Sequence, residues 1–458
     1  MARTNTAVAP RPRIHTHEGA PAVHINHEQQ LRRLSLATLL LESEFYVDGK
    51  TIAQQIADTI PHVKPERIAS LAVEAREKQK LRHLPLLLVR ELARYKTKNG
   101  KPLGSLVGDT LERVVQRPDE LNEFLALYWR EKRQPLSAQV KKGLQRAFAK
   151  FDAYQLRKWD RESTIKLRDV MFLVHPKPSG ELAEVYKELA SRETKAVNTW
   201  ETKLSAGEGK KTDEQKQVVW TEMLREKNLG ALALLRNLRN MIEANVDLDL
   251  IREALEHIKV ERVLPFRFIA AARYAPKLEP ELGRAMLKCL TVQQKLQGWT
   301  VLLIDVSGSM EAAISGKSEI TRMDAACGVA MLAREICEEV DVLTFSDRVA
   351  EVPPRHAFAL RDAIVSSQPH SGTQLGEAMR YVNGLRKCDR VIVLTDEQSH
   401  TAVPNPAASK AYMVNVASYK NGVGYGHGWE HIDGWSEAII DYVRELESAQ
   451  LAPSGEAC

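Results

Sequence analysis

Five oxygen-bearing side chains are spaced in a way that suits the binding of a divalent cation. Asp305, Ser307 and Ser309 alternate along a single turn, so their side chains can converge on one point. Thr373 follows in the segment HSGTQLGEAM, and Asp396 follows the apolar run VIVLT. Carboxylates and hydroxyls form an oxygen-only ligand set that suits Mg²⁺, with waters completing the coordination shell. We therefore predict a magnesium site with one open position that a carboxylate of a partner can fill.

Simpler roles compete with this interpretation. Ser and Asp residues often cap the segment that follows them, so the serines and Asp396 alone would be ambiguous. The order of the three motifs favours the cation site, because each falls in a loop of an alternating strand and helix pattern. A nucleophilic serine is disfavoured, because the sequence G-x-S-x-G is absent. An aspartyl phosphotransferase would need a second carboxylate in place of Ser307, so we expect no enzymatic activity.

The segments around these motifs predict an α/β domain over residues 293–458. The apolar runs WTVLLIDV, VDVLTFS, RVIVLTDE and AYMVNVAS alternate with helical segments such as MDAACGVAMLAREICEEV and QLGEAMRYVNGLR. Such strands alternating with helices predict a parallel sheet of Rossmann type, covered on both faces. Ligands bind to such sheets at the carboxyl ends of the strands. Asp305 and Asp396 each end a predicted strand, so both should emerge at the same edge.

Residues 28–292 have the periodicity of helices. Apolar residues recur three and four apart, as in Leu84, Leu87, Leu88 and Leu92, which is helical spacing. The segments PERIASLAVEAREKQ, LPLLLVRELARYK, LNEFLALYWREK and SAQVKKGLQRAFAKF predict short helices, with breaks roughly every twenty residues. This rhythm favours an all-α domain of HEAT-like repeats over an irregular helical domain. Residues 1–27 are predicted to be a flexible tail.

Charge divides the chain at the same boundary. Residues 1–290 contain 51 Lys and Arg against 38 Asp and Glu, and the remaining residues contain 14 against 22. The net charges are therefore +13 and −8, consistent with the total of +5. This asymmetry indicates a polyanionic partner for the helical part. We expect a cytoplasmic protein without a membrane span, because no apolar run has the length of a signal or a transmembrane helix.

The motifs in their order resemble the TROVE-domain family, which comprises the Ro autoantigen and its bacterial orthologues. The helical half contributes LRRLSLATLLLESEFYVDGKTI, VKKGLQRAFAKFDAYQLRKWDRES, IKLRDVMFLVHPKP and RVLPFRFIAAARY, and the second half contributes LLIDVSGSM, SGTQLGEAM and VIVLTDE. The resemblance covers roughly residues 28–440. It implies a closed ring of helical repeats whose ends are joined by a von Willebrand factor A-like domain with a metal-ion-dependent adhesion site.

The same resemblance implies a function in RNA handling. The ring would bind small noncoding RNA, or Y RNA, on a basic outer surface, and single-stranded ends of misfolded RNA in its central hole. It would act as a monomeric scaffold that tethers RNA to an exoribonuclease such as polynucleotide phosphorylase. The alternative is a metal-dependent protein-interaction module with no role for RNA.

One basic helix is the first candidate for RNA contact. In the segment SAQVKKGLQRAFAKFDAYQLRK, residues spaced three and four apart share one helical face, and they are Lys142, Arg146, Lys150, Ala153 and Arg157. Such a stripe can follow a phosphate backbone. The alternative is an ordinary solvated face of an amphipathic helix. The remaining basic candidates nearby are Lys141, Lys158, Arg161, Lys166 and Arg168.

Three further residues are weaker candidates for RNA contact. His175 lies in VHPKP, where a histidine more often packs and bonds to the backbone. Arg236 and Arg239 share one helical face in LLRNLRNM and can line the hole. Asn237 and Asn240 can equally mark a hydrogen-bonded seam between repeats. Both interpretations remain open.

Overall fold

The computed structural model describes most of the chain. The described residues are 26–36, 49–78, 80–95, 103–178, 180–195, 197, 200–205, 211–261, 263, 265–288, 295–313, 320–385, 387–417, 422–424 and 428–433, together with residues 15, 19, 439, 443 and 447. Most of the predicted tail at 1–27 lies outside these residues.

The first half of the helices stacks in two layers. They are α1 (His27–Leu36), α2 (Gly49–Thr59), the 3₁₀ helix η1 (Ile60–His62), α3 (Pro65–Glu77), α4 (His83–Arg94), α5 (Leu106–Val114), α6 (Pro118–Tyr128), α7 (Ala138–Phe148), α8 (Ala153–Trp159), α9 (Leu167–Val174) and α10 (Leu182–Ser191). In one layer α3 contacts α5, α5 contacts α7, and α7 contacts α9. The helices α5 and α7 meet at two glycines, because a Cβ on Gly143 would lie 2.8 Å from the carbonyl oxygen of Gly108.

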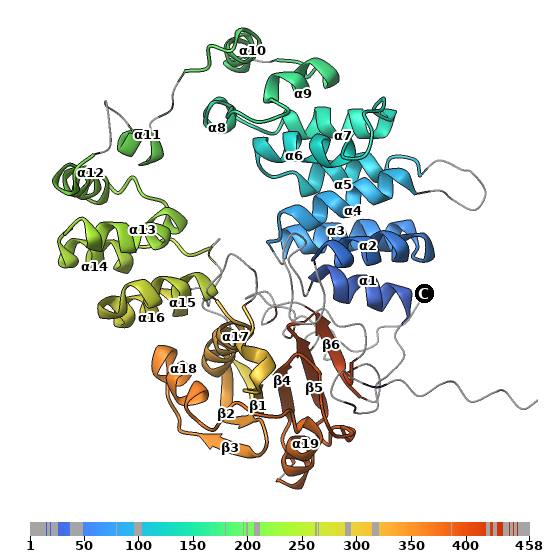
Figure 1. The fold of residues 1–458 in the computed structure, drawn as a ribbon, viewed down its shortest axis with the longest axis vertical. Helices are drawn as coiled ribbons and strands as arrows, with labels where there is room; N and C mark the ends of the chain where they lie inside the picture. Colours follow the sequence, from blue (N-terminus) through green and yellow to red (C-terminus); the bar gives the residue numbers. More distant parts are fainter. Residues whose placement is uncertain are drawn as a thin grey trace, which may run out of the picture.

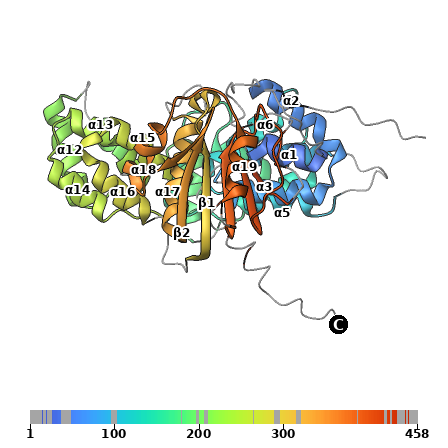
Figure 2. The ribbon, with the colours of Figure 1, turned by 90° about the horizontal axis from the view of Figure 1, so that it is seen from below.

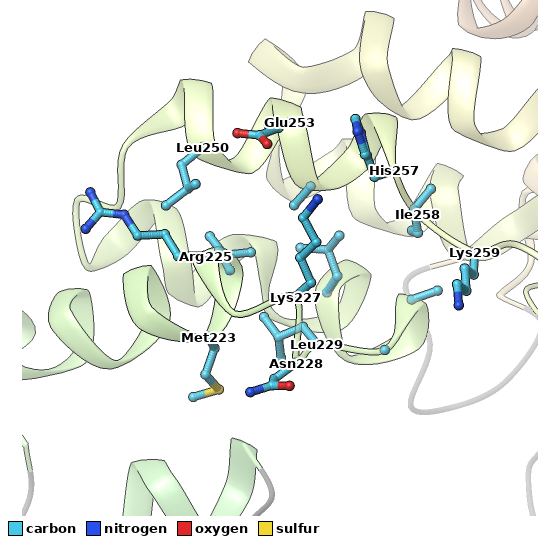
Figure 3. Close-up of a pocket in the computed structure, with 15 residues that line it drawn as sticks. Met223, Arg225, Lys227, Asn228, Leu229, Leu250, Glu253, His257, Ile258 and Lys259 are labelled. Carbon is cyan, nitrogen blue, oxygen red and sulfur yellow. The ribbon is translucent and has the colours of Figure 1, made fainter.

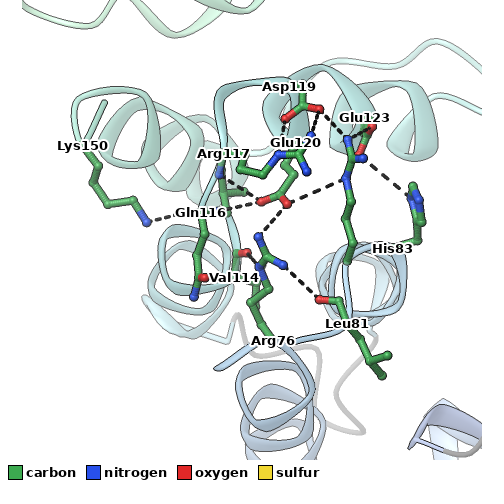
Figure 4. A network of polar contacts seen from close by, with 12 residues as sticks. Arg76, Leu81, His83, Val114, Gln116, Arg117, Asp119, Glu120, Glu123 and Lys150 are labelled. Atoms are coloured by element: carbon green, nitrogen blue, oxygen red, sulfur yellow. Dashed lines mark hydrogen bonds and ion pairs between the residues drawn. The ribbon is translucent and has the colours of Figure 1, made fainter. Parts of the chain in front are cut away.

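Buried polar contacts tie these layers together. Arg76 of α3 donates to the carboxylate of Glu120 of α6 at 2.6 Å and to the carbonyl oxygen of Val114 at 3.0 Å (Figure 4). Glu120 in turn accepts from the backbone nitrogens of Gln116 and Arg117. Because the buried Arg76 and Glu120 pair with each other and with backbone groups, this ion pair is tolerated inside the stack of helices.

The second half of the helices repeats the same stacking. They are α11 (Trp200–Ser205), α12 (Asp213–Arg225), α13 (Ala231–Glu243), α14 (Leu248–Glu256), α15 (Pro265–Tyr274), the 3₁₀ helix η2 (Pro276–Leu278) and α16 (Glu279–Leu287). Here α12 contacts α14, α13 contacts α15, and α14 contacts α16. The HEAT-like stacking predicted from the periodicity is therefore present in both halves.

The C-terminal part is a six-stranded sheet with helices on both faces. Its elements are β1 (Leu296–Asp305), the 3₁₀ helix η3 (Gly308–Glu311), α17 (Arg322–Ile336), β2 (Cys337–Phe345), β3 (Val349–Val352), α18 (Ala357–Val365), α19 (Leu375–Gly384), β4 (Arg390–Thr395), β5 (Lys410–Asn415) and β6 (Glu430–Asp433). The strand order is β3-β2-β1-β4-β5-β6. The predicted parallel sheet needs one correction, because β3 pairs with β2 antiparallel. The connection of three residues, 346–348, is too short for a parallel crossover.

The three parts form a ring (Figure 1). The helices α1–α10 make one arc, α11–α16 make the other, and the sheet domain joins their ends. Figure 2 shows the sheet standing between the two arcs. The first arc has its own hydrophobic core from Leu31 to Leu189. The second arc shares a core with one face of the sheet, and the other sheet face packs with α19.

The two ends of the sheet domain join the arcs by different chemistry. On one side α15 packs on α17, with Ile269 against Gly328. On the other side α1 contacts β6, and Arg33 of α1 pairs with Glu397, both completely buried. One junction is therefore largely apolar, and the other depends on a buried ion pair.

The predicted helices match α3, α4, α6 and α7, but the basic segment differs from its prediction. Residues 138–159 form two helices, α7 and α8, which are separated by Ala149–Asp152. The expected single cationic face is therefore wrong. The break has a local cause, because Asp152 caps α8 by accepting from the backbone nitrogen of Gln155 at 2.7 Å.

Candidate functional site

Asp305 and Asp396 lie side by side at one edge of the sheet. Strands β1 and β4 are parallel neighbours, and Ile304 pairs in register with Leu394. Asp305 ends β1 and Asp396 directly follows β4, so both carboxylates leave the sheet at the carboxyl ends of the strands. Both side chains are completely buried. The structure thus places these two residues as the sequence predicted.

The carboxylate of Asp305 is held on both oxygens. It accepts from the backbone nitrogen of Ser307 at 2.9 Å and from the hydroxyl of Thr395 at 2.6 Å. Burial, together with the charge of Asp396, raises the pKa of Asp305 to about 7. Two carboxylates this close in a dry site repel each other, and a bound cation would relieve that repulsion.

The predicted hydroxyl ligands lie beside these carboxylates. The hydroxyls of Ser307 and Ser309 are 3.2 Å apart. The loop that carries Thr373 reaches the same turn, because the backbone nitrogen of Gly308 donates to the carbonyl oxygen of Ser371 at 3.2 Å. Thr373 is itself almost buried, and its backbone nitrogen donates to His400 at 2.9 Å. Ser309 is half-buried and marks the side on which the site meets solvent.

Arg322 is a member of this site that the sequence analysis missed. It begins α17, is 1% exposed, and its guanidinium lies 3.5 Å from the carboxylate of Asp396. A cation in the first turn of a helix opposes the helix dipole, and this unfavourable position was the available sequence signal. Its single positive charge offsets part of the charge of the two carboxylates.

The donor set fits a hard cation. Two buried carboxylates and three neighbouring hydroxyls are all oxygen donors, which Mg²⁺ prefers. Among the described residues no three His, Cys, Asp or Glu side chains are grouped as a transition-metal site would require. One arginine against two carboxylates leaves a net negative charge for a cation to balance.

Three of the predicted RNA-contact residues form contacts within the protein, and they are Arg146, Arg157 and Lys150. Arg146 pairs with Asp109 at 2.6 Å and with Glu112 at 2.8 Å. Arg157 forms a two-pronged pair with Glu188 at 2.8 and 2.9 Å.

Lys150 is engaged in a similar way. Its ammonium group donates to the carbonyl oxygens of Glu112 and Val115, beside the Glu120 network (Figure 4). Burial of this group lowers the pKa of Lys150. Lys150, like Arg146 and Arg157, therefore links neighbouring repeats rather than forming an open stripe.

A second set of the predicted cations accompanies exposed aromatic rings. Lys158 lies 5.6 Å from the ring of Tyr154, which is 48% exposed. Arg168 lies 5.3 Å from the ring of Phe172, which is 49% exposed. Each pair is spaced by one helical turn. The cations were predicted from the sequence and the rings were not, although aromatic and basic residues alternate at this spacing in the sequence.

The other predicted residues of this region have mixed surroundings. Lys141 and Lys142 are exposed at the start of α7. Arg161 lies 4.8 Å from the ring of Trp159 and 3.7 Å from Glu201 of the second arc. Lys166 pairs with Glu162 at 2.8 Å.

His175 ends α9 in a left-handed conformation, with φ of 49°. It is exposed, and its carbonyl oxygen accepts from the side chain of Gln145 at 3.0 Å. This backbone contact agrees with a capping role and leaves the imidazole available at the surface.

Arg236 and Arg239 are both exposed on α13. Arg239 pairs with Glu243 at 2.8 Å and lies 5.4 Å from the ring of Tyr274. Asn240 donates to the side chain of Asn237 at 2.9 Å, and Asn237 donates to the carbonyl oxygen of Ala233. The asparagines therefore bond within α13 in these contacts.

Comparisons with known families match the second arc and the sheet domain of the ring. Residues 193–312 match the family model of the TROVE domain. Residues 300–417 match the model of the Ro60 vWA domain, which contains the Asp305 and Asp396 site. The chain therefore contains a TROVE domain followed by a vWA domain of the Ro60 type. This pair of domains implies an RNA-binding Ro protein.

A solved structure supports the same fold for this TROVE protein. The crystal structure of the Deinococcus radiodurans RO (RSR) protein has a TM-score of 0.60 at 17% sequence identity, and the match covers 93% of this chain and 100% of the other. No curated protein matches the chain. In the described part of the chain, no helix combines the length and apolar character needed to cross a membrane.

Proposed function

We propose that this TROVE protein is a ring-shaped scaffold in RNA quality control. It binds small noncoding RNA of the Y type on the basic outer surface of the first arc, and single-stranded ends of misfolded or structured RNA in its central hole. It presents these ends to an exoribonuclease such as polynucleotide phosphorylase and catalyses no reaction itself. The observation that carries the proposal is the set of exposed aromatic rings with cations beside them on α8 and α9.

The chemistry of this surface suits RNA rather than a generic anion. Unpaired bases stack on exposed rings such as Tyr154 and Phe172, and each stacked base contributes roughly 1–3 kcal/mol. Lys158 and Arg168 sit where they can contact the phosphates that flank such bases. Lys141 and Lys142 extend the positive surface to the start of α7. These six residues are called the α7–α9 surface below.

The positions of α7 and α8 in the ring support two kinds of RNA contact. Figure 1 shows α8 on the side of the first arc that faces the second arc, with α7 farther out. We assign the α7 lysines to structured RNA on the outer surface. We assign Tyr154 and Lys158 of α8 to a single strand that approaches the centre.

For the sheet domain we propose a bound Mg²⁺. Asp305, Ser307, Ser309, Thr373 and Asp396 would hold it, and it would balance the charge that Arg322 leaves uncompensated. A carboxylate of a partner protein would complete its coordination from the side where Ser309 meets solvent. The nuclease, or another protein of the RNA-processing machinery, is the partner that this site would recruit.

Purification from native cells tests the proposed class of partner. The protein should carry nucleic acid that absorbs at 260 nm and is removed by ribonuclease, and sequencing should recover structured noncoding RNAs. A preparation that carries only protein would contradict the RNA scaffold and favour the alternative, a metal-dependent protein-interaction module.

Charge reversal at Lys141 and Lys142 sharpens this test. The double variant should lose most of the copurifying RNA. The matched control is Lys277→Glu, an exposed lysine on the second arc, which should retain it. Equal RNA content in the wild type, the double variant and the control would show that the α7–α9 surface does not bind RNA.

A further inference from the structure

A pocket of about 550 Å³ lies between three helices of the second arc, far along the chain from the α7–α9 surface (Figure 3). It is bounded by the end of α12, the start of α13 at Gly230 and the last turns of α14. This volume is within the range of roughly 300–1,000 Å³ that small-molecule sites occupy. It is therefore large enough to enclose a small organic ligand.

The floor of the pocket is apolar. Leu229, Leu250 and Ala254 line it, and all three are half-buried. A flat apolar group that covers these side chains would remove them from water, which stabilises a complex by about 25 cal/mol for each Å² of apolar surface buried. The floor thus suits a planar ring more than a hydrated ion.

The rim of the pocket is positively charged. Arg225, Lys227 and Lys259 line it together with His257, and Glu253 is the acidic residue among the lining side chains. Figure 3 shows Lys227 extending toward the side of the pocket where Glu253 and His257 lie. The rim has three cations and one carboxylate, so it favours a ligand with a negative group.

These cations differ from Arg146 and Arg157 of the first arc in their surroundings. Arg146 and Arg157 are neutralised by carboxylates at 2.6–2.9 Å. Within the part of the chain that the structure describes, the side chains of Arg225, Lys227 and Lys259 form no hydrogen bond or ion pair. Basic groups that surround a hollow without acidic partners are placed for an external anion.

We propose that this pocket binds a nucleotide unit, either a free nucleoside monophosphate or a single nucleotide of an RNA strand. The base lies on Leu229, Leu250 and Ala254, with the imidazole of His257 available for stacking. The phosphate is bound by Lys227 through charge-assisted hydrogen bonds. The start of α13, where Gly230 provides no side-chain cap, adds unpaired backbone N–H groups.

Glu253 distinguishes a nucleotide from other anions with an apolar part. Its carboxylate accepts hydrogen bonds from neighbouring hydroxyls, as acidic residues do with the ribose of dinucleotides. A fatty acid has no such donors, so the carboxylate of Glu253 would face its hydrocarbon chain. The three components of a nucleotide thus each have a matching group in the pocket.

The test compares adenosine 5′-monophosphate, adenosine and inorganic phosphate by calorimetric titration into the full-length protein. Adenosine 5′-monophosphate should bind at least tenfold more tightly than either part alone. Lys227→Glu removes the phosphate contact and should weaken binding about tenfold or more, which corresponds to the loss of about one charge-assisted hydrogen bond. Ala254→Leu fills the floor where the base lies and should weaken binding about tenfold or more by steric exclusion. Lys64→Glu, on exposed Lys64 of the first arc, is the control and should bind as the wild type does.

A 5′-phosphorylated single-stranded oligoribonucleotide separates the two sources of the nucleotide. If the pocket binds a nucleotide of an RNA strand, Lys227→Glu and Ala254→Leu should weaken the binding of the oligonucleotide more than the binding of the monophosphate. If the monophosphate alone is affected, the ligand is a free nucleotide. The proposal is overturned if adenosine 5′-monophosphate binds no better than phosphate, if both pocket variants bind as the wild type does, or if an acidic peptide binds in its place. RNA binding at Lys141 and Lys142 is measured separately, so it stands or fails independently.

Discussion

Arg33 of α1 donates a hydrogen bond to Glu397, 364 residues farther along the chain, and neither side chain is exposed to solvent. Glu397 directly follows Asp396 and has a left-handed backbone, with φ of 60°. Asp396 therefore faces the cation site while Glu397 faces the first arc. A Cβ at Gly422 would collide with the guanidinium of Arg33, so this junction also requires close backbone approach.

Removal of Arg33 should weaken the ring at this junction. The variant Arg33→Met leaves Glu397 buried without its main partner, which typically costs about 3–5 kcal/mol. Urea denaturation measures the loss, and small-angle scattering should show a larger radius of gyration if α1 leaves the sheet domain. The control is Arg32→Met, because Arg32 pairs with Glu74 in a partly exposed position at 2.5 Å and should contribute about 1 kcal/mol or less. Equal losses in the two variants would contradict the role given to the buried pair.

The same junction predicts a dependence of stability on pH. Although burial disfavours its charged form, the carboxylates of Asp433 and Glu397 raise the pKa of His431 from 6.5 to about 9. A raised pKa in the folded state stabilises the fold fully below pH 6.5, and this contribution disappears as the pH rises through about 9. Arg33 also faces Glu397 and remains charged throughout this range.

Comparison of the wild type with His431→Gln isolates this contribution. The unfolding free energy of the wild type should fall by roughly 3 kcal/mol at most between pH 6.5 and pH 9.5. The fall should be smaller in the variant, because the neutral amide does not titrate. Parallel curves for the two proteins would show that His431 is not protonated in the fold.

Magnesium should stabilise the sheet domain. Ligand that binds only the folded state adds about 2.7 kcal/mol at a hundredfold excess over its Kd, which raises the melting temperature. Asp305→Ala should abolish this rise, since it removes one of the two carboxylates. The control Asp362→Asn changes an exposed carboxylate that pairs with Arg361 and should keep the response. A melting temperature that is insensitive to Mg²⁺ in the wild type would remove the cation site.

Two neighbouring cations of α8 should have opposite phenotypes. Arg157 pairs with Glu188 and holds the pKa of that carboxyl at about 2. Arg157→Ala should therefore lower the melting temperature while leaving RNA affinity unchanged. Lys158→Glu should leave the melting temperature unchanged and weaken RNA binding, because Lys158 lies beside the exposed ring of Tyr154. Calorimetry measures the melting temperature of each variant, and fluorescence anisotropy measures its RNA affinity. The reverse pattern would mean that Arg157 contacts RNA and Lys158 stabilises the fold.

The positions of Asp305 and Asp396 were predictable because they depend on local sequence. Each follows an apolar run, and parallel neighbouring strands bring their ends to one edge whatever the rest of the fold is. The stacked helices were predictable for the same reason, since apolar spacing of three and four residues sets which face is buried.

The predicted cationic stripe was wrong and the contact between Arg33 and Glu397 was not predicted, because both depend on residues far apart in the sequence. Arg146 and Arg157 look like members of an open stripe, but their carboxylate partners come from neighbouring repeats, 31–37 residues away. The break at Asp152 removed the shared helical face. Arg33 and Glu397 meet because the ring closes, and periodicity carries no information about that contact. The closed ring itself was expected from the family resemblance and not from spacing.

The most direct test of the RNA-binding scaffold is the affinity of the full-length protein for a structured RNA with a single-stranded tail, measured at several salt concentrations. We expect tight binding by the wild type with a steep salt dependence, since each phosphate contact contributes about 0.7–0.9 to the slope of log K against log salt. In the fourfold variant, Lys141, Lys142, Lys158 and Arg168 are changed to Glu. It should bind the RNA at least a hundredfold more weakly and with a shallower slope. The total loss of binding free energy should be roughly 5 kcal/mol or less. Wild-type binding that is weak, or identical in affinity and slope to that of the fourfold variant, would contradict the account.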